Sequence, residues 1–243
     1  MVTKHSDSRP TVTVIVPAKN EAKNLEHVLP RIPAWVTEVI LVDGHSTDST
    51  IAVAQLLMPT IKVVNQKGRG KGDALRAGFA AATSDIIVML DADGSTDPAE
   101  IPDFVEALVN GADFVKGSRF AVGGGTSDMS HLRRFGNWGF TTLVKVLFGG
   151  NFTDLCYGYN AFWRKTLPQL NLDGDGFEIE TIMNVRALRA GLKVVEVPSF
   201  ESERVHGESN LRTFPDGWRV LKAIGREAAA SMPVLSNPMA ARA

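Results

Sequence analysis

Four short runs of β-branched and aliphatic residues recur in the first hundred residues. They span residues 11–16, 38–42, 61–65 and 85–90. They are too short for typical helices, so each predicts a strand, and the runs at 11–16 and 38–42 read as buried strands. Segments with helical apolar spacing follow them at 20–30, 47–58, 73–82 and 98–109. This repeated strand–helix pattern predicts an α/β fold with a Rossmann-like, mainly parallel sheet flanked by helices.

The rest of the chain is less regular but has the same element types. We expect strands at 113–118, 161–163 and 194–197, helices at 131–148, 177–190 and 214–230, and a mobile glycine-rich loop at 121–130. No repeat or linker interrupts the 243 residues. The sequence therefore predicts one domain, residues 1–243, with a nucleotide-binding half (11–118), an acceptor-binding half (119–230) and a loose tail (231–243).

Bulk composition excludes several classes of protein. The net charge of −1 gives no reason to expect a nucleic-acid partner. The single cysteine, Cys156, cannot form an intramolecular disulfide and fits a reducing compartment. No signal peptide is recognisable, and no apolar run reaches the ~18 residues that a spanning helix needs. We expect a cytoplasmic protein, with peripheral attachment to the inner face of the membrane left open.

Polar loops follow three of the predicted strands, at 19–21, 43–48 and 91–93. Ligands of open α/β sheets bind beyond the carboxyl ends of the strands. These three loops should therefore converge on one crevice, which makes them the first candidates for a site.

Asp91 and Asp93 flank Ala92 directly after the fourth strand. Two carboxylates this close repel each other unless a cation or a proton lies between them. Mg²⁺ or Mn²⁺ would accept such oxygens and complete its shell with diphosphate and water. The alternative is an Asp-rich turn that caps the helix at Pro98.

Two further loops can contact a nucleotide. The Asp43 carboxylate can accept a hydrogen bond from a base imino group, although residues 46–48 could simply cap the next helix. The glycine-rich segment 68–72 can bring backbone N–H groups and Lys71 close to phosphate, or it is a flexible surface turn.

Three acidic residues are candidate bases for an acceptor hydroxyl: Asp154, Glu178 and Glu180. A phosphate acceptor would need no base. Glu178 and Glu180 do not share a helix face, so only one should point inward, and the other would compensate the helix dipole.

A polar loop near the end of the chain, RVHGESNLR, contains Arg204, His206, Ser209 and Asn210. Arg204 and His206 can pair with phosphate oxygens, and His206 can also ligate a metal.

Taken together, these motifs resemble the inverting GT-A glycosyltransferases of family two, nearest to the polyprenol-phosphate mannosyl- and glucosyl-synthase-like group. The resemblance spans about residues 12–211. It rests on the order and spacing of VIVPAKNE, LVDGHSTDST, GRGKGDALRAG, VMLDADGSTDP, VKGSRF, TDLCYGYNAFWR, GFEIET, AGLKVVEVP and RVHGESNL.

The resemblance implies roles for individual residues. Those lining the nucleotide pocket would be Pro17, Ala18, Asn20, Glu21 and Asp43, with Lys71 nearby. Asp91, Ala92 and Asp93 would engage metal and diphosphate, and Asp93 is the firmer metal ligand. Arg119 would lie near the sugar or acceptor, Asp154 and Glu180 would fill acidic catalytic positions, and Arg204 and His206 would reach the diphosphate or the acceptor phosphate.

The chain departs from this group at three points. Many relatives carry two aspartates where this chain has Asp43-Gly44, and Asn160 stands where an arginine is usual. If that arginine binds the lipid phosphate, a polyprenyl phosphate acceptor becomes doubtful. No QxxRW element is present, which favours a single sugar transfer over polymer synthesis.

The sequence thus predicts a metal-dependent hexosyltransferase that moves one hexose from a UDP- or GDP-sugar with inversion. The acceptor is polyprenyl phosphate or a small metabolite, and a homodimer is left open. Aromatic and basic residues in 131–148 are typical of interfacial helices, but equally of a core helix with surface arginines. The alternatives are a sugar-1-phosphate nucleotidyltransferase and a catalytically silent sugar-nucleotide-binding homologue.

Overall fold

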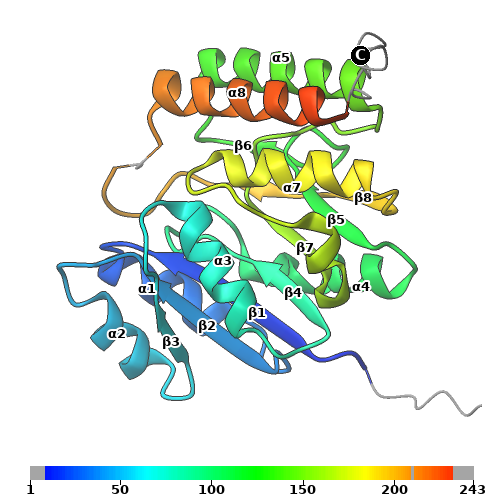
Figure 1. The fold of residues 1–243 in the computed structure, drawn as a ribbon. Helices are drawn as coiled ribbons and strands as arrows, with labels where there is room; N and C mark the ends of the chain where they lie inside the picture. The colour runs from blue at the N-terminus through cyan, green and yellow to red at the C-terminus, as the bar shows by residue number, and fades with distance from the viewer. Residues whose placement is uncertain (1–8, 209–210, 232–243) are drawn as a thin grey trace, which may run out of the picture.

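The computed structural model describes residues 9–208 and 211–231, and its centre is one seven-stranded sheet (Figure 1). The strand order is β3-β2-β1-β4-β7-β5-β8. The strands are β1 (Val12–Ala18), β2 (Glu38–Asp43), β3 (Lys62–Asn65), β4 (Ile86–Met89), β5 (Phe114–Ser118), β7 (Asn160–Trp163) and β8 (Val194–Pro198). β7 is antiparallel to both β4 and β5, whereas the other neighbours pair in parallel. The predicted mainly parallel α/β sheet is confirmed.

Helices cover both faces of the sheet. One face is covered by α1 (Ala22–Val28), α2 (Thr50–Leu57) and α4 (Ile101–Val109), and the other by α3 (Lys71–Ala81), α6 (Leu167–Leu170) and α7 (Glu178–Arg189). The strands alternate between these two layers: in β1, Val14 packs into the first core and Ile15 into the second. Because both faces are buried, the strands need apolar residues at successive positions, as the sequence showed.

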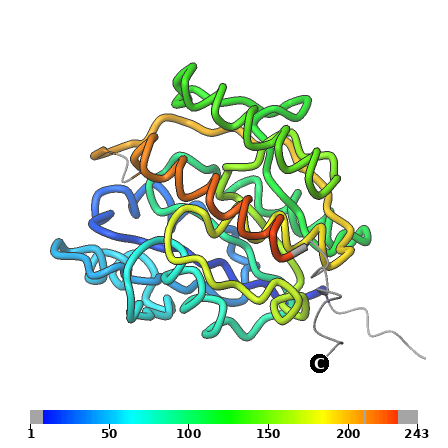
Figure 2. The backbone as a smooth tube through the Cα atoms, turned by 45° about the horizontal axis from the view of Figure 1, so that its top comes forward, coloured from blue at the N-terminus to red at the C-terminus, as the bar shows by residue number. Residues whose placement is uncertain are grey.

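Two long helices form an outer layer on α7. They are α5 (His131–Phe148) and α8 (Thr213–Ser231), which lie side by side beyond α7 (Figures 1 and 2). Val144 of α5, Val185 of α7 and Ile224 of α8 share a small third core. Outward from this core both helices expose large side chains, among them Trp138 and Phe214.

The segment 121–130 is mostly turns, bends and irregular backbone, as its glycines predict, but it also includes a short strand. It contains β6 (Gly125–Thr126), which pairs in parallel with β9 (Phe200–Glu201) as a separate two-stranded sheet. Strands of two residues carry no readable periodicity, so the pairing depends on contacts distant in sequence. Short 3-10 turns at Leu29–Arg31, Pro98–Glu100 and Arg164–Thr166 complete the elements. The tail predicted beyond residue 231 lies outside the described residues.

Within residues 9–208 and 211–231, no helix is both long and apolar enough to cross a membrane.

Candidate active site

A cavity of about 990 Å³ lies at the carboxyl ends of the central strands. β2, β1 and β4 are neighbours in the sheet, so the loops after Asp43, Ala18 and Met89 meet there. Six of the lining side chains are lysines or arginines and three are carboxylates, which gives the cavity a basic lining suited to a phosphorylated ligand. The lining residues include the predicted Pro17, Ala18, Glu21, Lys71, Asp91, Ala92, Asp93 and Arg204.

Lys71 joins two predicted acidic residues on one side of the cavity. Its Nζ lies 2.7 Å from Asp91 Oδ1 and 2.7 Å from Glu180 Oε1. Burial opposes the charged form of Lys71, but the two carboxylates outweigh it and raise the lysine pKa. Burial raises the pKa of Asp91, and the adjacent Asp93 adds to the effect against the opposing influence of Lys71. The chain at Gly158 passes so close that a Cβ there would lie 2.8 Å from Lys71 Nζ.

Arg204 joins the other two carboxylates of the cavity. Its Nη1 lies 3.2 Å from Asp93 Oδ2, and its Nη2 pairs with Glu21 Oε1. Ser95 donates its N–H and its hydroxyl to Asp93 Oδ1, at 3.0 and 2.7 Å. Asp97, not Asp91 or Asp93, accepts the N–H of Ala99 at the start of the Pro98 turn. The aspartate pair is therefore not the cap of that helix.

Asp43 presents one free oxygen at the end of β2. Its Oδ2 accepts the N–H of Ser46 at 3.1 Å, while its buried Oδ1 has no hydrogen-bond partner among the described residues. Asp48 has the structural role, since its oxygens accept the N–H groups of Thr50 and Ala22 at 3.0 and 3.2 Å. Asn20 holds the neighbouring loop by accepting the N–H of Thr47 at 2.7 Å. A buried acceptor without a hydrogen bond costs folding free energy, so Asp43 Oδ1 is suited to accept a hydrogen bond from a bound ligand.

The glycine-rich segment 68–72 contributes less than predicted. The N–H groups of Gly72 and Asp73 point to the Asp175 carbonyl, at 2.8 and 3.3 Å, so they are not free for phosphate. A Cβ at Gly72 would collide with the Gly174 carbonyl, which explains why a glycine is needed there. The side chains of Lys71 and Arg69 from this segment line the cavity.

Arg119 and Asp154 form a buried bidentate pair, and neither lines this basic cavity. Arg119 Nε and Nη2 lie 2.6 and 2.9 Å from the two Asp154 oxygens, and Nη1 lies 3.0 Å from Glu201 Oε2. Asp154 is fully buried, which favours its neutral form, yet pairing with Arg119 lowers its pKa. The guanidinium also lies over the Tyr157 ring, 4.7 Å from its centroid. Both Asp154 oxygens are thus occupied by Arg119.

The two glutamates at the start of α7 have separate roles, as their spacing predicted. Glu180 is buried and faces Lys71, whereas Glu178 Oε1 accepts the N–H groups of Asp175 and Gly176 at 3.2 and 2.9 Å.

His206 is not brought to the carboxylates. Its exposed ring lies against that of His27, with the centroids 5.7 Å apart. Its carbonyl accepts the Nε–H of Arg204 at 2.7 Å. The structure therefore gives no support to His206 as a metal ligand, and its backbone positions Arg204 instead. Ser209 and Asn210 lie outside the described residues.

Sequence reasoning missed several site residues, among them Glu201, Phe177 and Lys116 and the cavity-lining Gln66, Lys67 and Arg212. Glu201 is the second carboxylate on Arg119, Phe177 lines the cavity, and the fully buried Lys116 donates to the Tyr157 carbonyl at 2.8 Å. Phe177 lies within the quoted GFEIET motif, although only its two glutamates were named as site residues. Glu201 and Lys116 lie in strands where a charged residue usually faces solvent, so the sequence offered no signal.

Comparisons with known proteins agree with this geometry. The model of "Glycosyl transferase family 2" matches residues 13–170. The chain is 35% identical over 214 residues to an undecaprenyl-phosphate mannosyltransferase of Micrococcus luteus, covering 82% of this chain and 87% of that protein. It is 32% identical over 227 residues to glycosyltransferase AglJ of Haloferax volcanii, covering 92% and 74%.

The fold is shared with a solved structure of glucosyl-3-phosphoglycerate synthase from Mycobacterium tuberculosis. The TM-score is 0.72 at 23% identity, covering 90% of this chain and 80% of that one. The predicted family, the GT-A fold and the predicted enzyme class are confirmed. The chain belongs to glycosyl transferase family 2 and is a glycosyltransferase whose relatives include polyprenol-phosphate mannosyltransferases.

Proposed function

We propose that the protein transfers one hexose from a UDP- or GDP-sugar to polyprenyl phosphate, with inversion and with Mg²⁺ or Mn²⁺. The observation that carries this proposal is the junction of two unlike cavities. Phe177 lines both the basic cavity at the strand ends and a second, largely apolar cavity of about 360 Å³ between α5 and α8. A basic cavity fits a sugar nucleotide, and an apolar one beside it fits a hydrocarbon chain.

The apolar cavity has the lining that an isoprenoid would need. Its walls include Leu132, Phe140, Trp218, Val220 and Leu221, and its inner end reaches Arg119 and Glu180. An acceptor phosphate at that end would lie beside the Lys71–Glu180 pair, with the chain running outward between the helices. Relatives named as undecaprenyl-phosphate, dolichol-phosphate and polyprenol monophosphate mannose enzymes support this acceptor class.

The Asn160 substitution does not weigh against a phosphate acceptor. Asn160 is fully buried, and its Nδ2 donates to the Gly158 carbonyl at 3.1 Å. Asn160 lines neither cavity, so an arginine lost at this position leaves the cavities' basic residues in place.

The carboxylates fit a hard divalent cation. Asp91 and Asp93 are each compensated by a protein cation, Lys71 and Arg204, which is what two neighbouring carboxylates without a metal require. No group of three or more metal-binding side chains occurs in residues 9–208 and 211–231. A metal bound to Asp93 and Asp91 would therefore need diphosphate oxygens of the sugar nucleotide and water as further ligands. When bound, the cation would offset charge on the departing diphosphate. Crystals of the mycobacterial synthase with Mn²⁺ or Mg²⁺ and UDP support this use of metal.

The chain's own residues then have separate tasks. Asp43 Oδ1 would accept a hydrogen bond from the nucleotide base, and Lys71 and Arg204 would bind diphosphate oxygens. Inversion follows from a single in-line displacement in which the acceptor phosphate is itself the nucleophile. Because that oxygen is already anionic near neutral pH, Glu180 would position Lys71 rather than remove a proton. Asp154 would hold Arg119 toward the acceptor. Polyprenyl phosphate resides in membranes, so the reaction would take place at the cytoplasmic membrane surface.

A donor–acceptor matrix tests the proposal. UDP- and GDP-hexoses are incubated with Mn²⁺, Mg²⁺ or a chelator, and with undecaprenyl phosphate, 3-phosphoglycerate or no acceptor, while released UDP or GDP is measured. We expect release that needs both the metal and the lipid phosphate. Turnover with 3-phosphoglycerate but not with undecaprenyl phosphate would show that the acceptor is a small metabolite and not a lipid. Pyrophosphate release from a nucleoside triphosphate and a sugar 1-phosphate would favour the nucleotidyltransferase, and donor binding without turnover would favour the silent homologue.

A further inference from the structure

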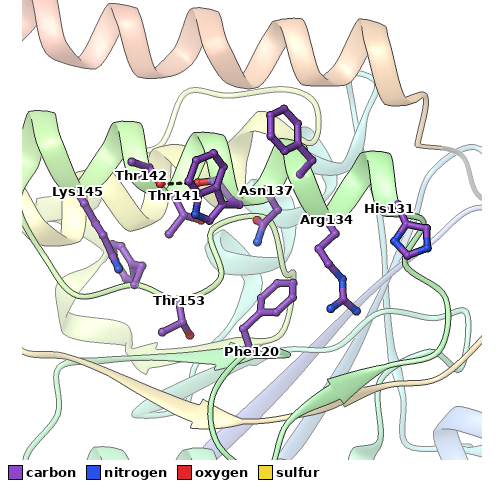
Figure 3. Close-up of a pocket in the computed structure, with 11 residues that line it drawn as sticks. Phe120, His131, Arg134, Asn137, Thr141, Thr142, Lys145 and Thr153 are labelled. Atoms are coloured by element: carbon purple, nitrogen blue, oxygen red, sulfur yellow. Dashed lines mark hydrogen bonds between the residues drawn. The ribbon is translucent and has the colours of Figure 1, made fainter.

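A third cavity lies on the opposite side of α5 from the apolar one. It has a volume of about 640 Å³ and lies between α5 and the loops that carry Phe120, Phe152 and Thr153 (Figure 3). The lining side chains of α5 recur at helical spacing from His131 to Lys145, so one face of the helix forms the whole upper wall. This cavity plays no part in the transfer reaction proposed above.

The cavity is lined by basic residues and by no acidic ones. The basic residues are His131, Arg134 and Lys145. Neither Arg134 nor Lys145 has an ion-pair partner in the described part of the chain, although Arg133, which faces the other cavity, pairs with Asp128 at 3.3 Å. Behind the lining residue Thr153, the Glu196 carboxylate accepts the N–H and the hydroxyl of Thr153, at 2.8 and 2.6 Å. In a chain of net charge −1, such a cavity favours an anion.

Two buried polar groups in the wall have no partner. Asn137 and Thr141 are each 4% exposed, and Asn137 Nδ2 and Thr141 Oγ1 have no hydrogen-bond partner among the described residues. Asn137 Oδ1 accepts the N–H of Cys156 at 3.0 Å, which fixes the amide so that its NH₂ side is left to donate elsewhere. Thr142, by contrast, bonds back to the Trp138 carbonyl at 2.8 Å. Unpaired buried donors call for a ligand rich in acceptor oxygens.

The mouth of the cavity is aromatic and open. Phe135 and Trp138 are 67% and 62% exposed, with ring centroids 5.7 Å apart. Arg134 lies over the Phe120 ring, 5.5 Å from its centroid. Exposed aromatics next to lysine and arginine are the side chains that settle at the boundary between lipid headgroups and hydrocarbon.

We infer that this cavity binds the phosphate headgroup of an anionic phospholipid while α5 lies in the membrane interface. The phosphate oxygens would accept from Arg134, Lys145, Asn137 Nδ2 and Thr141 Oγ1, and the acyl chains would leave past Phe135 and Trp138. The site goes beyond the proposed reaction and does not depend on the identity of the acceptor.

Flotation of the full chain with vesicles tests this site. The protein is mixed with phosphatidylcholine vesicles that contain or lack phosphatidylglycerol. We expect binding to the anionic vesicles, and a roughly 30-fold loss of affinity in the Arg134→Gln/Lys145→Gln variant, at about fivefold for each charge near the surface. The Lys23→Gln/Lys165→Gln variant makes the same change of net charge outside α5 and should bind like the wild type. Equal binding by the two double variants would overturn the inference.

A second variant distinguishes headgroup binding in the cavity from general electrostatic attraction to the vesicle surface. Thr141→Val removes one buried donor without changing charge, so we expect affinity for anionic vesicles to fall by a few fold while the melting temperature is unchanged or higher. Wild-type affinity in Thr141→Val would show that no headgroup is bound in the cavity. Calorimetry with inorganic phosphate distinguishes the source of the anion: binding that needs Arg134 and Lys145, in a protein that ignores anionic vesicles, would also overturn the lipid site.

Discussion

Arg204 Nη1 lies 3.2 Å from Asp93 Oδ2, while Ser95 donates twice to the other oxygen of the same carboxylate. Residues 93 and 204 thus meet across the cavity, and the Asp93 charge is balanced by a cation from a loop more than a hundred residues away. A metal that binds Asp93 would have to share Oδ2 with the guanidinium or displace it. The position of Arg204 and the binding of such a metal would therefore be coupled.

Asp93→Asn should remove metal-dependent transfer. An amide keeps the shape but cannot balance a divalent cation, so we expect turnover to fall on the order of 100-fold or more. Mn²⁺ titration by calorimetry should show weakened binding in the same variant. Asp103→Asn, which neutralises an exposed carboxylate on α4, is the matched control and should keep full activity. If Asp93→Asn kept full activity, Asp93 would have no metal role.

Glu180→Gln distinguishes a phosphate acceptor from a hydroxyl acceptor. If Glu180 only positions Lys71, loss of one ion pair should raise the donor KM about tenfold and leave kcat within a few fold. Loss of a general base would instead lower kcat by about 10²–10⁴. Glu178→Gln is the control, because that side chain bonds the backbone at the start of α7. A large fall in kcat for Glu180→Gln alone would point to a hydroxyl acceptor.

Metal binding should weaken on mild acidification through Asp91. Burial and the neighbouring Asp93 raise the pKa of Asp91 above 3.8, so its protonated form is populated at a higher pH than for an ordinary aspartate. Since a metal ligand must be ionised, Mn²⁺ affinity should fall as the pH drops through this raised pKa. Binding isotherms between about pH 4 and pH 7 measure this window. Asp91→Asn should flatten the dependence, and an unchanged slope in that variant would exclude Asp91 as its source.

Arg119→Gln should destabilise the protein strongly. It leaves the fully buried Asp154 charge without its bidentate partner, at a cost of about 3–5 kcal/mol in the free energy of unfolding. The lowered Asp154 pKa contributes stability above its unfolded value near 3.8, which is lost as pH falls through the folded pKa. Urea unfolding at neutral pH measures the cost, and Asp154→Asn in the same chain should restore part of it.

Arg133→Gln is the reference for that measurement. It breaks the more exposed pair with Asp128 and should cost only about 0–1 kcal/mol. Equal losses in the Arg119 and Arg133 variants would contradict the buried-pair argument.

Cys156 should be a slow nucleophile. Burial raises the pKa of its thiol to about 12 from an ordinary value of 9.0, and Asp154 adds to the shift. The thiolate fraction at neutral pH is then lowered about 10³-fold, so alkylation by iodoacetamide should be slower by a similar factor. Free cysteine provides the reference rate, and denatured protein shows that the thiol is intact. Alkylation of the native protein at the free-cysteine rate would contradict the raised pKa of the Cys156 thiol.

Local patterns predicted much of the framework. Apolar runs of four to six residues with helical segments between them predicted the strands and most helices, because burial on both faces leaves a readable signature. The Asp91–Asp93 pair was predicted from its place after a strand. Helix spacing predicted that only one of Glu178 and Glu180 points inward, and the family resemblance singled out Glu180. The antiparallel insertion of β7 between β4 and β5 was not predicted, because periodicity gives no strand direction.

Local sequence features were enough to predict that a mainly parallel sheet brings Asp43, Asp91 and Asp93 to one edge, since strand ends and the loops after them can be recognised locally. Which cation balances each carboxylate follows from the folded chain alone: Lys71 joins Asp91 to Glu180, and Arg204 joins Asp93 to Glu21. The tertiary structure also decided that Gly72 and Asp73 donate to Asp175 and that His206 turns to His27. Such pairings depend on distances between segments remote in the chain, and no local spacing encodes them.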